Sequence, residues 1–142
     1  MAGKFQVAGC AIIEKENKVL LTRRSLGRWR GGFWEFVSGR IEQGEDLIEG
    51  LKREVQEEVE LEINPLYPIH VAHFYRGSEH IAENEIFMIT YVATWVHGEV
   101  QLKTDEQDKF EWVDLRKINF LNYPGLKDLF GDEIAAYLKL RI

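Results

Sequence analysis

Short apolar runs recur along the chain and predict a protein rich in β-strands. Residues 4–13 and 19–22 form two such runs, and the polar segment 14–18 between them predicts a hairpin. Further strands are predicted over residues 33–37, 69–75, 85–96 and 110–113. Pro124 is predicted to open a C-terminal helical region with a break at Gly131 and Asp132.

The segment from residue 44 to 58 has helical periodicity instead. Leu47, Leu51 and Val55 stand at i, i+4 and i+8, which places them in one apolar stripe that can dock on a sheet. The helix is predicted over residues 47–58, with Glu45 or Asp46 near its positive end. Upstream, Gly39 is expected to adopt a backbone conformation closed to other residues.

Three carboxylates of this helix project from one face. Glu54, Glu57 and Glu58 stand at i, i+3 and i+4, a spacing at which like charges repel and destabilise a helix. A Glu-rich helix is most often a solvated face, and that interpretation stays open from these three residues alone. The alternative is a site for a hard divalent cation such as Mg²⁺, which takes oxygen ligands and shares its shell with substrate phosphates.

Composition narrows the classes of function. The chain has 142 residues, which suggests a single domain over residues 1–142, and its net charge of −6 disfavours a nucleic-acid polymer as partner. Cys10 is the only cysteine, which excludes an intrachain disulfide and a multi-cysteine zinc site, and its apolar neighbours predict a buried thiol. No signal peptide is recognisable and no apolar run reaches transmembrane length, so we expect a cytoplasmic protein without a membrane partner. Monomer and homodimer both stay open.

The helix belongs to a longer gapped pattern. The pattern reads Gly39, five residues, Glu45, seven residues, Arg53-Glu54, the apolar Val55, one residue, Glu57-Glu58. It resembles the Nudix box, G-x5-E-x7-R-E-U-x-E-E-x-G-U with U apolar, and eight of the nine specified positions match. Glu60 stands where the family has glycine, and a non-glycine residue in a left-handed helix cap costs about 1 kcal/mol.

The order of predicted elements is similar to the MutT-like branch of the Nudix hydrolases. The resemblance implies an α/β fold, an α/β/α sandwich around a mixed β-sheet in which the box forms a loop–helix–loop. Members hydrolyse a nucleoside diphosphate linked to another moiety, and MutT-like members typically convert nucleoside triphosphates to monophosphate and pyrophosphate. The resemblance implies Mg²⁺ as cofactor, with Mn²⁺ as a possible substitute. Its ligands would be Glu54, Glu57, Glu58 and the Gly39 carbonyl.

Catalytic roles also follow from the resemblance. Glu57 or Glu58 would lie closest to the attacking water, and Arg53 would orient carboxylates, through Glu45, rather than touch substrate. Glu106 matches the segment in which MutT-like enzymes place an additional acid, so it is a candidate metal ligand or base. An acid in a polar loop is an equally good interpretation of Glu106.

Candidate substrate contacts lie outside the helix. Arg24 and Arg40 match basic positions that meet phosphates in the MutT-like branch, although an arginine leaving a strand is by default solvated. Asn122 can read a base edge because an amide offers donor and acceptor together. The aromatic side chains that can stack on a base, or belong to the core, are Trp29, Trp34 and Phe74.

The substrate itself stays open between several phosphoric anhydrides. Trp34-Glu35-Phe36 matches MutT-like enzymes that act on oxidised nucleotides such as 8-oxo-dGTP. The following Val37-Ser38-Gly39 and the missing box glycine look more like dihydroneopterin triphosphate pyrophosphohydrolases. Nucleotide sugars and dinucleoside polyphosphates are further alternatives. A non-catalytic nucleotide-binding module is disfavoured because all three box glutamates are present.

Overall fold

Strand β1, Gln6–Lys15, is the centre of the fold in this computed structural model, which describes residues 3–102 and 105–141. On one edge it runs parallel to β6, with Gln6 opposite Ile86 and Glu14 opposite Thr94. Its other edge is shared by two antiparallel strands. Strand β4 pairs with residues 8–11, and β2 forms the hairpin that joins Glu14 to Val19. The predicted hairpin is therefore confirmed.

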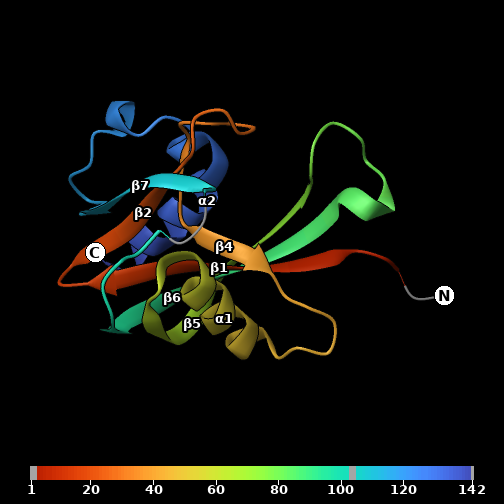
Figure 1. Cartoon of the computed structure of the whole chain (residues 1–142), viewed down its shortest axis with the longest axis horizontal. Coiled ribbons are helices and arrows are strands. Elements are labelled where there is room, and N and C mark those ends of the chain that lie inside the picture. Colours follow the sequence, from red (N-terminus) through yellow and green to blue (C-terminus); the bar gives the residue numbers. More distant parts are fainter. Residues whose placement is uncertain (1–2, 103–104, 142) are drawn as a thin grey trace.

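Seven strands form one mixed sheet between two helices (Figure 1). The other strands are β2 Lys18–Arg24, β3 Trp34–Glu35, β4 Val37–Arg40, β5 Glu62–Tyr75, β6 Glu85–His97 and β7 Gln107–Val113. Their order is β3-β2-β1-β6-β5, with β4 added on β1 and β7 on β2. The helices are α1 Leu47–Val59 and α2 Leu126–Lys139, and the short 3₁₀ turns are η1 Ala82–Asn84 and η2 Phe120–Asn122.

Alternate side chains of β1 belong to two separate hydrophobic cores, one on each face of the sheet. Cys10 and Ile12 belong to the core on the α2 side, whereas Ala11 and Ile13 belong to the core on the α1 side together with Leu51. This alternation follows from the two-residue period of a strand. The predicted α/β/α sandwich is confirmed. No helix within the described residues is long and apolar enough to cross a membrane.

Helix α1 begins and ends with defined caps. The side chain of Asp46 accepts hydrogen bonds from the backbone N–H groups of Ile48 and Glu49, at 3.1 and 3.2 Å. The stripe predicted from Leu47 to Val55 continues to Val59, one residue beyond the predicted end. Glu60 ends the helix in the left-handed conformation, with φ 63° and ψ 30°. The chain therefore keeps the glycine-like geometry of the box without the glycine.

Two predicted strands have different bounds in the structure. The strand predicted over 69–75 begins at Glu62, because Pro65 and Pro68 lie in an edge strand whose pairing shifts near both prolines. The strand predicted over 33–37 is two strands, since Trp34–Glu35 pairs with β2 and Val37–Arg40 with β1. The chain thus crosses from one strand to the other just before the box.

The predicted break in the C-terminal helix lies one residue early. Phe130, not Gly131 or Asp132, has non-helical backbone angles, with φ −126° and ψ 24°. Its ring is buried and packs edge to face on Phe36, 5.3 Å between ring centroids. This contact gives the kink a packing partner in the core.

Candidate active site

The glutamates of α1 lie in three different environments. Glu58 lines a cleft, Glu54 is mostly buried beside β4, and the side chain of Glu57 is 59% exposed. Gly39 lies against Glu54 so closely that a Cβ atom there would collide with its carboxylate. Gly39 does not have a positive φ, so the prediction of a conformation closed to other residues is wrong. What the position requires is close approach between β4 and α1.

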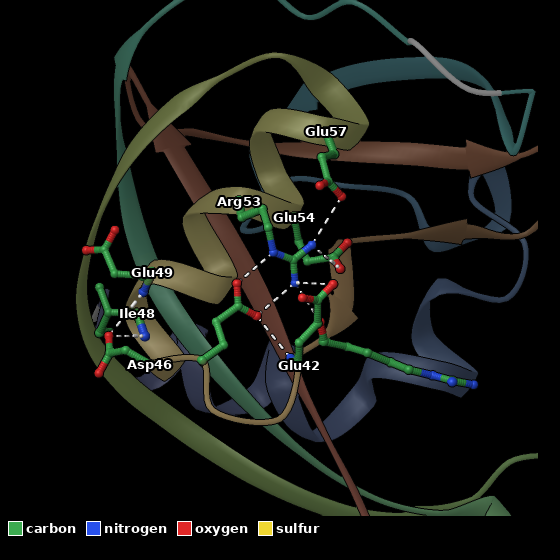
Figure 2. A network of polar contacts seen from close by, with 9 residues as sticks. Glu42, Asp46, Ile48, Glu49, Arg53, Glu54 and Glu57 are labelled. Carbon is green, nitrogen blue, oxygen red and sulfur yellow. Dashed lines mark hydrogen bonds and ion pairs between the residues drawn. The ribbon is translucent and has the colours of Figure 1, made fainter.

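Arg53 makes hydrogen bonds to several parts of the box (Figure 2). Its Nε and Nη2 donate to the two carboxylate oxygens of Glu45, at 2.7 and 2.9 Å. Its Nη1 donates to Glu54 and Glu57, at 3.1 and 3.2 Å, and Nη2 also reaches the backbone carbonyl of Arg40, at 3.1 Å. The contact with Glu45 expected from the sequence is present. One guanidinium thus joins the loop before α1 to two of the box glutamates.

Glu45 is strongly stabilised as an anion. The hydrogen bonds from Arg53, helped by the backbone N–H of Glu42, lower the pKa of Glu45 to about 2. These bonds favour the charged form of the carboxyl group. A charge-assisted fork therefore helps to hold the loop that precedes α1.

Glu58 has the opposite environment. Burial, and then the neighbouring carboxylates of Glu54, Glu35 and Glu106, raise its pKa to about 8. Arg24 opposes this shift. Burial also raises the pKa of Glu54 and of Glu35. Several carboxylates thus stand near one another with too little positive charge to balance them.

This donor set fits a divalent cation. In the described part of the chain, no three His, Cys, Asp or Glu side chains are already gathered as a metal site. However, burial and then the neighbouring carboxylates raise the pKa of Glu58, and a hard cation would neutralise the charges of these carboxylates and take their oxygens as ligands. The missing side chain of Gly39 lets the backbone of β4 approach the carboxylate of Glu54 closely. Glu54, Glu58 and Gly39 therefore fit the predicted metal site, with Glu57 at its exposed margin.

The cleft lies between the sheet and α2 and has a volume of about 570 Å³. Its floor is apolar, with Ala8, Ile86 and Met88 on the face of the sheet that also carries Cys10. Its polar lining consists of arginines 24, 30, 40 and 76 and of the acids Glu35, Glu58, Glu106, Asp128, Asp132 and Glu133, among other residues. This volume and mixed lining suit a small charged ligand.

Three of the arginines form a positive cluster. Burial lowers the pKa of Arg76, and the charges of Arg40 and Arg24 lower it further. Arg24 is held by the backbone carbonyl of Trp29, at 3.0 Å from its Nε, and lies 3.5 Å from Glu35. Such a cluster favours a polyanion such as a chain of phosphates. Sequence reasoning missed Arg76, although it follows β5 much as Arg24 ends β2.

Not every predicted site residue reaches the cleft. Arg24, Arg40, Gly39, Glu58 and Glu106 line it. Asn122 is not among the residues that line it, so its contact with a base edge stays a prediction. It is exposed in η2, where Asn119 caps the turn and the following Tyr123 packs on Trp34.

The aromatic candidates separate in the same way. Trp34 is buried and belongs to the core, whereas Trp29 is 60% exposed and Phe74 39% exposed, and both line the cleft. Sequence reasoning missed Glu35 and Glu133 as well. Glu35 lies in the Trp-Glu-Phe motif, which was read only for its substrate hint, and Glu133 lies in an apolar helical stretch with nothing local to mark it.

Comparison with known proteins agrees with the box and the fold. The family model of the NUDIX domain matches residues 3–132. The chain belongs to the Nudix family. A crystal structure of a MutT protein from Methanosarcina mazei superposes on this Nudix domain with a TM-score of 0.77 and 26% identity, covering 99% of this chain and 98% of that one.

Two curated relatives carry different activities in their names. An isopentenyl-diphosphate Delta-isomerase of Klebsiella pneumoniae is 36% identical over 110 residues, 75% of this chain and 59% of the isomerase. An 8-oxo-dGTP diphosphatase of Proteus vulgaris is 38% identical over 60 residues, 42% of this chain and 54% of that protein. The Nudix domain described here thus spans little more than half the length of either relative. Their common chemistry is a diphosphate group.

Proposed function

We propose that this Nudix domain is a hydrolase that converts a nucleoside triphosphate to a monophosphate and pyrophosphate, with Mg²⁺ as cofactor and Mn²⁺ as substitute. One observation carries the proposal. The box residues Gly39 and Glu58 line the same cleft as Arg24, Arg40 and the rest of the arginine cluster. Phosphoryl transfer depends mainly on positioning and on neutralising charge, and this cleft offers groups for both.

Each group has a definite task in this proposal. Glu54, Glu57, Glu58 and the Gly39 carbonyl hold the cation, which when bound polarises phosphoryl oxygens and makes a water more acidic. Arg53 acts as a positioning residue, since its bonds go to carboxylates and to a backbone carbonyl.

The arginine cluster and one acid complete the reaction. Arg24 and Arg40 bind the phosphates. Glu58 accepts the proton of the water that attacks phosphorus, while the bond to the leaving pyrophosphate breaks. Of the two glutamates that the sequence left open as base, Glu58 is favoured because it lines the cleft, whereas Glu57 is exposed and bound to Arg53. Glu106 lines the cleft near Glu58 and is the alternative base or a further ligand.

The cleft favours a small molecule with a phosphoric anhydride, and several such substrates are candidates. An oxidised nucleotide such as 8-oxo-dGTP is supported by the Proteus relative. Dihydroneopterin triphosphate, nucleotide sugars and dinucleoside polyphosphates remain alternatives with the same reacting group. We expect a cytoplasmic protein that acts on a small molecule.

A second candidate is isomerisation of a prenyl diphosphate, which the Klebsiella relative favours. Moving a double bond requires an acid and a base that face a carbon chain. The one thiol of the sequence, Cys10, is fully buried, and burial raises its pKa far above the ordinary value. Carboxylates would have to perform both steps, in a cleft whose arginines and acids suit a more polar ligand than a prenyl chain.

A pyrophosphate-release assay with Mg²⁺ tests the proposal. Its panel holds normal NTPs and dNTPs, 8-oxo-dGTP and dihydroneopterin triphosphate. A nucleotide sugar, whose hydrolysis gives two monophosphates and no pyrophosphate, is followed separately by its monophosphate products. We expect release from at least one triphosphate, loss of activity in a chelator and recovery with Mg²⁺ or Mn²⁺. Isopentenyl diphosphate is incubated in parallel and examined for its isomer. Isomer formation without turnover of any triphosphate would overturn the proposal, and tight nucleotide binding without turnover would indicate a binding module.

A further inference from the structure

One buried acid of the cleft has no task in phosphoryl transfer. Glu133 on α2 is only 3% exposed and yet lines the cleft. Burying a carboxyl group without a partner is unfavourable. In the described residues its carboxylate accepts a hydrogen bond only from its own backbone N–H, and the nearest basic side chain is His70, with 3.9 Å between Nε2 and Oε2. That distance is too long for a hydrogen bond.

Glu133 belongs to a face of α2 that is turned toward the sheet. Asp128 and Leu129 before the kink at Phe130, and Asp132 and Glu133 after it, all line the cleft. Across from them lies the apolar floor of Ile86 and Met88. A flat ring can rest on such a floor while its polar edge meets the helix.

The position of Glu133 along the cleft separates it from the phosphate-binding arginines. Its neighbour His70 and the cleft-lining Arg76 are six residues apart along β5, which corresponds to roughly 20 Å of extended strand. Arg76 stands with Arg24 and Arg40. A ligand whose phosphates occupy the arginine cluster would therefore present its other end toward α2.

We infer that Glu133 reads the nucleobase of the substrate through two adjacent N–H donors, the pattern of the guanine edge with N1–H and the 2-amino group. This inference rests on the proposed function and names its substrate class. An ionised carboxylate only accepts hydrogen bonds, and its two oxygens match two parallel donors. Burial raises the pKa of Glu133, and donors on the base would favour its ionised form.

The experiment compares dGTP with dITP, which lacks only the 2-amino group. Pyrophosphate release is measured with Mg²⁺ for the unaltered protein and for E133Q, which keeps the size of the side chain. A hydrogen bond to a charged group is worth 1.5–3 kcal/mol, or about tenfold to hundredfold. We expect the unaltered protein to prefer dGTP by about that factor in kcat/KM. E133Q should lose the preference, because its amide oxygen can still accept from the N1–H of either base, whereas its amide N–H₂ opposes the 2-amino group that only dGTP has. E62Q, an exposed glutamate of β5, is the matched control and should keep the preference.

Retained activity on dITP shows that E133Q is folded. An unchanged ratio of dGTP to dITP in E133Q, or an equal loss for both nucleotides, would overturn the inference. If the unaltered protein hydrolyses other triphosphates but shows no preference for dGTP over dITP, the inference fails and the proposed function stands. If it releases pyrophosphate from no triphosphate, the proposed function fails and this inference with it.

Discussion

Two glutamates of the box have pKa values shifted in opposite directions. Glu45 lies in the loop before α1, here called the loop side, and Glu58 lines the cleft, here called the cleft side. On the loop side, Arg53 lowers the pKa of Glu45 to about 2. On the cleft side, burial and neighbouring carboxylates raise the pKa of Glu58 to about 8. Only twelve residues lie between the two glutamates in the sequence. The difference therefore comes from the partners that the fold supplies, not from local sequence.

The charged groups of the box thus fall into two kinds: those that hold the backbone geometry and those that are available to a ligand. The loop side is already neutralised by a guanidinium and holds its geometry without a ligand. On the cleft side the described residues do not balance the charges of the carboxylates, so Glu58 stays protonated up to about pH 8, and this side lines the same cleft as the arginine cluster. Perturbed pKa values of this kind are typical of functional sites. The following changes test each side in turn.

The largest effect is expected on the cleft side, from E58Q. The substitution keeps the shape of the side chain but removes the proton acceptor and an anionic ligand, so kcat should fall by about 10²- to 10⁴-fold. The control is E49Q on the same helix, whose parent side chain is 68% exposed and should be dispensable. Turnover is measured by pyrophosphate release at saturating substrate. Full activity of E58Q would remove Glu58 from the site.

A smaller loss is expected on the loop side, from R53K. Lysine keeps the charge but cannot make the fork to Glu45 while also reaching Glu54 and Glu57. Loss of residues that position ligands typically costs about 10- to 100-fold in activity or metal affinity. We expect a higher Mg²⁺ concentration for half-maximal activity. R23K is the control, because Arg23 makes a similar fork with Asp108, 2.8 Å for both bonds, outside the box. Equal Mg²⁺ dependence in both variants would refute the positioning role of Arg53.

The loop side could be predicted from the sequence, and the cleft side only in part. Glu45, Arg53 and the box glutamates lie in one short segment, so a gapped pattern was enough to expect the Arg53–Glu45 contact. Glu35, Arg76 and Glu133 come from three distant elements. Only the pairing of β3 with β2, the length of β5 and the kink of α2 bring them together. No local pattern encodes such long-range packing.

The misplaced elements have related causes. The strand predicted from residue 69 begins at Glu62, because an edge strand with shifted pairing tolerates Pro65 and Pro68. Gly39 was expected to provide a special φ, but the structure uses its missing side chain. Asn122, chosen by its chemistry alone, lies exposed in a 3₁₀ turn, and its contact with a base stays a prediction.

The two pKa shifts should give opposite dependences of stability on pH. Glu45 has a lowered pKa in the fold, so its contribution is present above its unfolded value of about 4.5 and is lost as the pH falls toward 2. Glu58 has a raised pKa, so its contribution is full below about 4.5 and is lost as the pH rises through 8 in a chelator. Denaturant unfolding of E45Q and E58Q across pH 2–9 measures both. The unaltered protein should lose stability relative to E45Q at the acid end, and relative to E58Q at the alkaline end. The same pH profile in both variants would show that the two sides do not differ.

The smallest effect is expected beyond both sides, where α1 ends at Glu60. Its φ of 63° is strained for any residue with a Cβ, so E60G should relieve about 1 kcal/mol, less the entropy that glycine adds to the unfolded chain. We expect a net gain of up to about 1 kcal/mol, or a rise in Tm of about 2–4 °C, by thermal unfolding. E60Q distinguishes backbone strain from charge repulsion. It keeps the Cβ, and so the strain, but removes the negative charge of Glu60 beside Glu62 and Glu99 on the same surface. A loss of stability in E60G would mean that the side-chain contacts of Glu60 outweigh its backbone strain. Activity should be unchanged in both variants, since within the described residues Glu60 does not line the cleft and the hydrogen bonds of Arg53 go to other residues.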